Sequence, residues 1–195
     1  MAKIVLNPAI QVISGDVSGF VYRHQADGSV VIAKAGVRHG AYEPTPAQVA
    51  QMQKFKEASA RYTRLMQEAG VKEAYEKVLA AAGPGARMNA MVIGDILSAP
   101  KIDTLDLSRY QGRAGDTIRV LAEDNVGVAR LELTIRDQTA SAVLETASYQ
   151  LDDRVRGEME WVYTATVDAP IDHAIEVQVA AYDLAGNKME HASVM

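Results

Sequence analysis

The sequence of 195 residues predicts an α+β N-terminal module, followed by an all-β sandwich of two antiparallel sheets. Two observations lead to this fold class. Residues 43–97 carry helix start and stop signals with apolar residues three or four apart, whereas residues 101–195 alternate over short segments separated by turn signals. Ser98-Ala99-Pro100 separates the two patterns, so we expect domains at residues 1–99 and 100–195.

The first 42 residues are predicted to form β-structure dominated by one long hairpin. Its arms run near residues 17–25 and 30–34, and Asp27-Gly28 supplies the tight turn because glycine tolerates positive φ. Apolar side chains point to both faces of this hairpin, so both faces must be shielded from water by other parts of the chain or by another molecule. The side chains expected to take part in self-association are Val17, Phe20, Val21, Tyr22, Val30, Val31 and Ile32.

A helix is predicted to begin after Thr45. Thr45 can cap the first free amides, Pro46 fits the first helical position, and Gln48 completes a capping box. Two shorter helices are expected at residues 71–82 and 89–97. Apolar residues recur along the first helix at steps of mostly three or four, which predicts one apolar stripe on its surface. The stripe consists of Val49, Met52, Phe55, Ser59, Tyr62, Leu65, Met66 and Ala69.

Seven short strands are predicted after residue 100, with Asp, Asn and Gly in the turns between them. A sandwich of two antiparallel sheets requires this spacing of strands. In the third strand apolar and charged or polar residues alternate, which indicates one buried face and one solvent-exposed face. Trp161 or Tyr163 should anchor the core, since large aromatic side chains bury much area. The strands are expected at residues 102–107, 117–123, 129–136, 143–151, 160–167, 174–182 and 188–194.

Two turn motifs stand out in the C-terminal half: Ala-Glu-Asp-Asn-Val-Gly-Val at residues 122–128 and Ala-Tyr-Asp-Leu-Ala-Gly-Asn at residues 181–187. They resemble the turns of bacterial immunoglobulin-like (Big-type) domains of surface and fibre proteins. The resemblance covers residues 100–195 and implies a binding, spacer or structural module without catalytic residues. The segments Gly15 to Arg23 and Thr45 to Gln48 resemble an uncharacterised bacterial and phage-associated hairpin-plus-helix module, which implies an architecture but no activity.

The same turns supply the candidate metal ligands. In a sandwich, the loop after the second strand and the loop before the last strand fall at the same end, which would bring the polar residues of both loops together. Carboxylate and amide oxygens are the ligands that calcium prefers. The alternative is that Asp and Asn occupy these turns because they bond their own backbone. The candidate calcium ligands are Asp124, Asn125, Asp183 and Asn187.

The sequence shows no catalytic constellation. It has no cysteine, its four histidines are scattered, and it lacks a phosphate loop, a nucleophile elbow and a dinucleotide fingerprint. We therefore expect no enzymatic activity, and no cofactor other than the candidate calcium ion.

The charge is uneven along the chain. The net charge of −5 divides into +3 over residues 1–99 and −8 over residues 100–195. A charge of +3 is too weak for the phosphate contacts of a nucleic-acid-binding protein. A head-to-tail contact between copies fits the asymmetry, and the alternative is ordinary surface scatter.

The location of the protein is not indicated by the sequence. The first residues lack the apolar core of a signal peptide, and no run approaches the roughly 20 apolar residues of a membrane span. We therefore expect neither a signal peptide nor a membrane-spanning segment. A place in an extracellular filament or a virion would then require a signal-independent route.

These observations favour a structural subunit of a filament or shell. A two-stranded hairpin is marginal alone, and apolar strands with free edges invite pairing with another chain. We therefore expect a polymeric homo-oligomer that forms by strand addition at the hairpin and displays the immunoglobulin-like domain. The alternative is a monomeric or dimeric binding or adhesion module, or a phage decoration protein, that recognises carbohydrate or protein.

Overall fold

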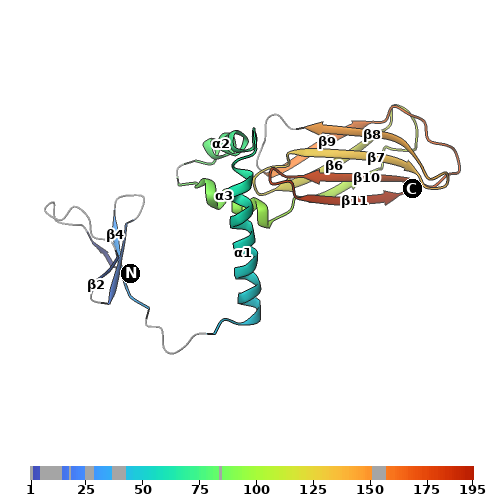
Figure 1. Cartoon of the computed structure of the whole chain (residues 1–195). Helices are drawn as coiled ribbons and strands as arrows, with labels where there is room; N and C mark the ends of the chain where they lie inside the picture. Colours follow the sequence, from blue (N-terminus) through green and yellow to red (C-terminus); the bar gives the residue numbers. More distant parts are fainter. Residues whose placement is uncertain are drawn as a thin grey trace. The chain divides into compact units, whose positions relative to one another are not determined.

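The protein is an α+β molecule whose strands form three antiparallel sheets (Figure 1). In the computed structural model, the described part of the chain holds three α-helices and eleven strands. It divides into two compact units, Met1–Val49 and Ala50–Met195, which we call the N-terminal and the C-terminal unit. The described residues are 2–4, 15–17, 19–24, 29–36, 43–83, 85–150 and 157–195.

Four short strands form the sheet of the N-terminal unit: β1 (Ala2–Ile4), β2 (Gly15–Val17), β3 (Phe20–His24) and β4 (Val30–Lys34). Their order is β1-β4-β3-β2. The two central strands pair antiparallel with Tyr22 opposite Ile32. The first arm, predicted near residues 17–25, is shorter than expected, because Val17 lies in the separate strand β2 opposite Phe20. Gly19, just before β3, has a φ of +80°, a conformation that favours glycine. The predicted Asp27-Gly28 turn lies outside the described residues.

One face of this sheet is largely apolar. Residues that pair directly across two strands project to the same face. Val30 on this face is only 1% exposed, whereas Phe20 is 47% exposed. The opposite face carries Val21, Arg23 and Val31. Among the described side chains, the largely apolar face consists of Phe20, Tyr22, Val30 and Ile32 together with the basic Lys34.

The first helix, α1 (Pro46–Leu65), begins with the predicted capping box. Thr45 N donates to Gln48 Oε1 at 2.8 Å, and Gln48 N donates to Thr45 Oγ1 at 3.3 Å. The shorter helices α2 (Val71–Ala81) and α3 (Met88–Leu97) follow close to the predicted positions. No described helix is both long and apolar enough to span a membrane.

The apolar stripe of α1 has two different surroundings. Towards its C-terminal end, Tyr62 and Leu65 pack into a hydrophobic cluster with α2 and α3. Towards its N-terminal end, Val49, Met52 and Phe55 remain 50%, 65% and 52% exposed. The predicted stripe is therefore buried over only part of its length.

The other seven strands form two sheets, with the orders β5-β6-β9 and β11-β10-β7-β8. We call these two sheets the two-sheet body. Their number and order along the chain agree with the seven predicted strands. The bounds are β5 (Lys101–Asp106), β6 (Thr117–Asp124), β7 (Arg130–Asp137), β8 (Ala142–Gln150), β9 (Gly157–Thr164), β10 (Ile175–Tyr182) and β11 (Lys188–Val194).

Both sheets contribute alternate residues to one hydrophobic core. Leu131, Leu133 and Ile135 of β7 are at most 1% exposed, as their alternation with charged residues predicts. Val120 of β6 and Trp161 of β9 belong to the same cluster from the other sheet. Burying apolar surface between the two sheets removes it from water, and this is what holds them together.

The helices pack on one end of the two-sheet body. Leu65, Tyr75 and Val92, one from each helix, share a cluster with Val126 and Ala185 from two turns of that body. This packing explains why the compact units divide within α1, at Val49 and Ala50. The division differs from the expected boundary at residues 99 and 100, because the helices bury their apolar faces against these turns.

Candidate functional site

Three buried aspartates meet where α3 contacts the turns of the two-sheet body. Asp95 lies near the end of α3, Asp124 ends β6, and Asp183 follows β10. Their exposed fractions are 0%, 9% and 4%. One carboxylate oxygen from each residue lies within 4.8 Å of the others. We call this group the three-aspartate cluster.

The two turn aspartates are held by backbone amides of their own turns. Asp124 Oδ2 accepts hydrogen bonds from Val126 N at 2.7 Å and from Gly127 N at 2.8 Å. Asp183 Oδ1 accepts from Asn187 N at 2.7 Å. Both aspartates therefore bond the backbone of their own turns, which is the alternative to metal binding considered for these residues. These bonds also fix the direction of each carboxylate.

Asp95 connects α3 to two other elements. Its Oδ2 accepts a short hydrogen bond from the Tyr75 hydroxyl of α2 and a second one from Ala185 N at 3.0 Å. The other oxygen, Oδ1, is buried and has no hydrogen-bond partner among the described residues, and the same holds for Asp124 Oδ1. A buried polar atom left without a partner costs about 1–3 kcal/mol. The cluster thus holds two buried oxygens that accept no hydrogen bond from the described residues.

Asn187 bridges the last turn to α3 and α1. Its Nδ2 donates to Asp183 Oδ2 at 2.7 Å and to the Asp95 carbonyl at 2.8 Å. Its Oδ1 accepts from Arg61 Nη1 at 3.0 Å, while Arg61 Nη2 donates to the Ala185 carbonyl at 2.5 Å. The side chain therefore satisfies a carbonyl at the end of α3 and places the Arg61 guanidinium beside the cluster.

Burial makes the ionised forms of Asp95 and Asp183 unfavourable. Burial raises the pKa of Asp95 to about 7, although the hydrogen bond from Tyr75 opposes this, and the charges of Asp183 and Asp124 raise it further. Burial also raises the pKa of Asp183 to about 6, opposed by its bonds with Asn187. Three like charges in one buried site require either a proton or a positive ion for balance.

The structure brings together two of the four predicted ligands. Asp124 and Asp183 lie in the cluster, whereas Asn187 stands beside it with its amide oxygen bound to an arginine. Asn125 is exposed; a Cβ on Gly94 would lie 3.8 Å from its Nδ2. The prediction missed Asp95. The signal was present, because this residue is the single acidic side chain in α3, a helix that is apolar apart from Asn89 and Asp95.

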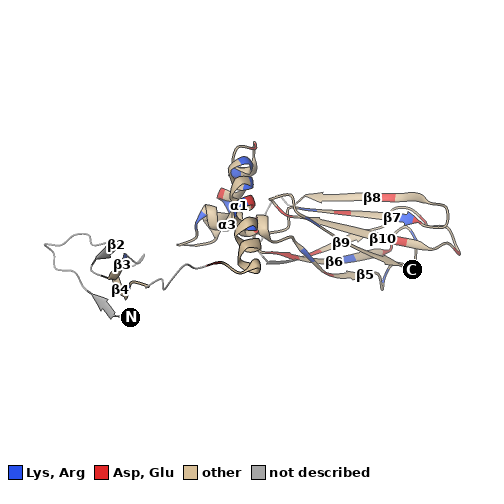
Figure 2. Ribbon diagram, turned by 60° about the horizontal axis from the view of Figure 1, so that its bottom comes forward, with Lys and Arg blue, Asp and Glu red and all other residues tan. Residues whose placement is uncertain are grey.

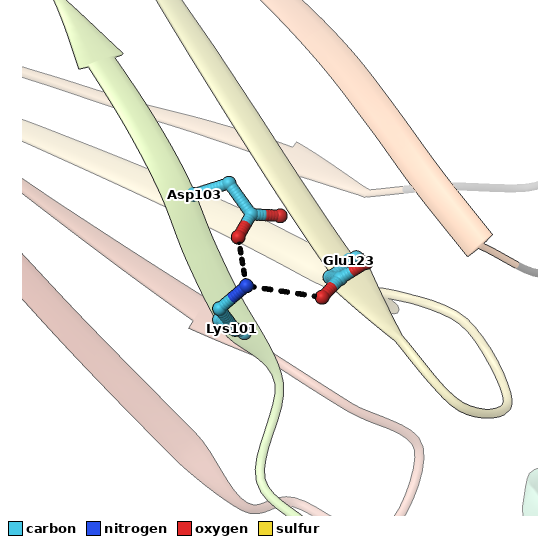
Figure 3. A network of polar contacts seen from close by, with 3 residues as sticks. All are labelled: Lys101, Asp103 and Glu123. Atoms are coloured by element: carbon cyan, nitrogen blue, oxygen red, sulfur yellow. Dashed lines mark hydrogen bonds and ion pairs between the residues drawn. The ribbon is translucent and has the colours of Figure 1, made fainter.

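A second polar group lies at the surface of the two-sheet body, on β5 and β6. Lys101 Nζ contacts the carboxylate of Asp103 and lies 3.2 Å from Glu123 Oε1 (Figure 3). Solvent reaches these side chains and screens their charges, so each ion pair contributes little to stability. The carboxylates of this surface group are reached by solvent, whereas those of the three-aspartate cluster are buried.

Comparison with known proteins gives one partial similarity. No protein-family model matches the chain, and no curated protein matches its sequence. A crystal structure of a hypothetical protein from Pyrococcus horikoshii OT3 is 11% identical, with a TM-score of 0.29. The match covers 50% of this chain and 88% of the other. A similarity at this level assigns neither fold nor function.

Proposed function

We propose that the protein is a structural subunit that assembles with further copies through its N-terminal unit. In this proposal the two-sheet body is an immunoglobulin-like sandwich of the bacterial Big type, which the assembly displays. Seven antiparallel strands in two sheets around one core support that assignment. The proposal gives the protein no catalytic role.

The observation that carries the proposal is the incomplete cover of the N-terminal sheet. Of its described side chains, Val30 alone is buried, while Phe20 on the same face is 47% exposed. The outermost strands β1 and β2 are three residues long, and within the described ranges no strand pairs with their outer edges. Open edges beside an apolar face are the features by which strands add to another chain.

The charge distribution favours a second copy as the partner. The N-terminal unit carries a net charge of +1 and the C-terminal unit carries −6, and charged residues lie along several strands of the two-sheet body (Figure 2). Unlike charges at the two ends of one chain favour a head-to-tail contact between copies. Because such a contact joins different surfaces, its repetition produces a ring or a filament.

Phe20→Glu is expected to weaken assembly of the full chain at least about tenfold in dissociation constant, since a charge replaces an apolar contact at the interface. Lys34 pairs with Phe20 across the sheet, so the new carboxylate has a basic neighbour and the sheet should still form. Light scattering at a series of protein concentrations measures the mass of the assembly, and negative-stain imaging shows its form.

Ile171→Glu is the matched control. Ile171 is an apolar residue of the C-terminal unit that is 87% exposed, so this variant adds the same charge at a different surface and should assemble as the natural chain does. A natural chain that stays monomeric at every concentration would contradict the proposal. So would a Phe20→Glu variant that assembles like the natural chain.

A further inference from the structure

We propose that the three-aspartate cluster binds one divalent cation of the calcium class, and that the bound ion fastens α3 to two turns of the two-sheet body. Asp95 supplies the ligand from the helix, and Asp124 and Asp183 supply the ligands from the turns. This inference is independent of assembly, because it concerns the C-terminal unit alone.

The spacing of the oxygens suits a calcium ion. Calcium binds oxygen at about 2.3–2.6 Å, so two oxygens on one ion can stand up to about 5 Å apart. The three carboxylate oxygens lie within 4.8 Å of one another and therefore meet this limit as they stand. Magnesium binds at about 2.0–2.1 Å in a strict octahedron, which would demand a tighter cluster.

The unused oxygens point to a positive ligand. Asp95 and Asp124 each accept hydrogen bonds at Oδ2, whereas their Oδ1 atoms are buried without a hydrogen-bond partner among the described residues. Both carboxylates are at least nine-tenths buried and are held in direction by their bonded oxygens. A cation would use the lone pairs that no donor of the described residues reaches. The ligands are thus oriented before the ion arrives, which lowers the cost of binding.

The charge of the cluster matches a divalent ion. Three ionised carboxylates carry three negative charges, and the neighbouring Arg61 guanidinium, which acts on Asp183, supplies one positive charge. The remaining two negative charges equal those that one divalent cation neutralises. A monovalent ion would leave a net charge in a buried site, where an unbalanced charge is costly.

The competing occupant is a proton shared among the carboxylates, and calcium titration separates the two. After treatment with a chelator, the full chain is titrated with calcium chloride in a calorimeter and in a thermal unfolding assay. We expect saturable binding of one ion per chain and a rise in the melting temperature. At a free calcium concentration 100 times the dissociation constant, the ratio of folded to unfolded protein should rise about 100-fold.

Asp95→Asn and Asp124→Asn should both abolish calcium binding. In each variant the amide oxygen can accept the hydrogen bonds that the carboxylate now accepts, so we expect the chain to fold. Each variant removes one charged ligand. Asp103→Asn is the matched control, because it makes the same substitution in the surface group of Figure 3 and should bind calcium like the natural chain. Terbium luminescence excited through Tyr75, whose hydroxyl contacts Asp95, gives a second measure of occupancy.

The chelated proteins give a further distinction. Without an ion, Asp95→Asn should be at least as stable as the natural chain, because it relieves repulsion among the carboxylates. With calcium, the natural chain should become the more stable of the two. The proposal is overturned if millimolar calcium neither binds nor raises the melting temperature of the natural chain. It is also overturned if both buried variants bind calcium as tightly as the natural chain does.

Discussion

Asn187→Ala is expected to lower the free energy of unfolding of the C-terminal unit by about 2–4 kcal/mol. The amide of Asn187 donates to the buried carboxylate of Asp183 and to the Asp95 carbonyl, and its oxygen accepts from Arg61. Removing it leaves buried acceptors unpaired, and a bond to a charged group contributes about 1.5–3 kcal/mol. Urea unfolding measures the loss, and hydrogen exchange should show it first at the amides of α3.

Asn89→Ala is the matched control for this prediction. Asn89 lies in the first turn of α3, is exposed, and bonds the amide of the next residue. The same change there should alter stability by no more than about 0.5 kcal/mol. If both variants lost the same amount, Asn187 would not be the residue that joins the last turn to the helices.

The parts of the fold that the sequence predicted are those set by local patterns. Leu131, Leu133 and Ile135 alternate with charged residues, and this period of two places them in the core whatever the neighbouring strand is. Thr45 and Gln48 form their capping box within a single helical turn. In both cases the residues that decide the structure lie next to one another in the chain.

The parts that it missed depend on packing between distant segments. The apolar stripe of α1 can face the N-terminal ribbon or the two-sheet body equally well, and nothing local to Tyr62 or Leu65 selects the second. The same holds for Asp95. A single acidic residue in an apolar helix indicates a buried partner, but its partners Tyr75 and Ala185 become known only when α2 and the last turn are placed.

In the presence of a chelator, the protein is expected to lose stability as the pH rises from about 4 to about 7. The pKa of Asp95 is about 7 in the folded protein, raised mainly by burial, against 3.8 for an ordinary aspartate carboxyl. Within this window the folded state binds more protons than the unfolded state, so the free energy of unfolding falls with rising pH. Three pKa units correspond to a loss on the order of 4 kcal/mol.

Burial sets the sign of this slope, and the groups around Asp95 modify its size. Asp124 and Asp183 from the turns oppose its ionisation, whereas the Tyr75 hydroxyl from α2 favours it, and Arg61 from α1 acts on Asp183. Carboxyls with a lowered pKa have the opposite effect, since their stabilisation disappears as the pH falls below about 4, outside this window.

Asp95→Asn isolates the contribution of this carboxyl, because the variant keeps every other titrating group. Urea unfolding at pH 4, 5, 6 and 7 should show a shallower decline for the variant than for the natural chain. Equal slopes would contradict the prediction. Calcium should act in the opposite direction on the natural chain, because carboxylate ligands must lose their protons to bind it, so its stabilising effect grows with pH. A shared proton and a bound ion therefore stabilise the same three carboxylates at opposite ends of one pH range.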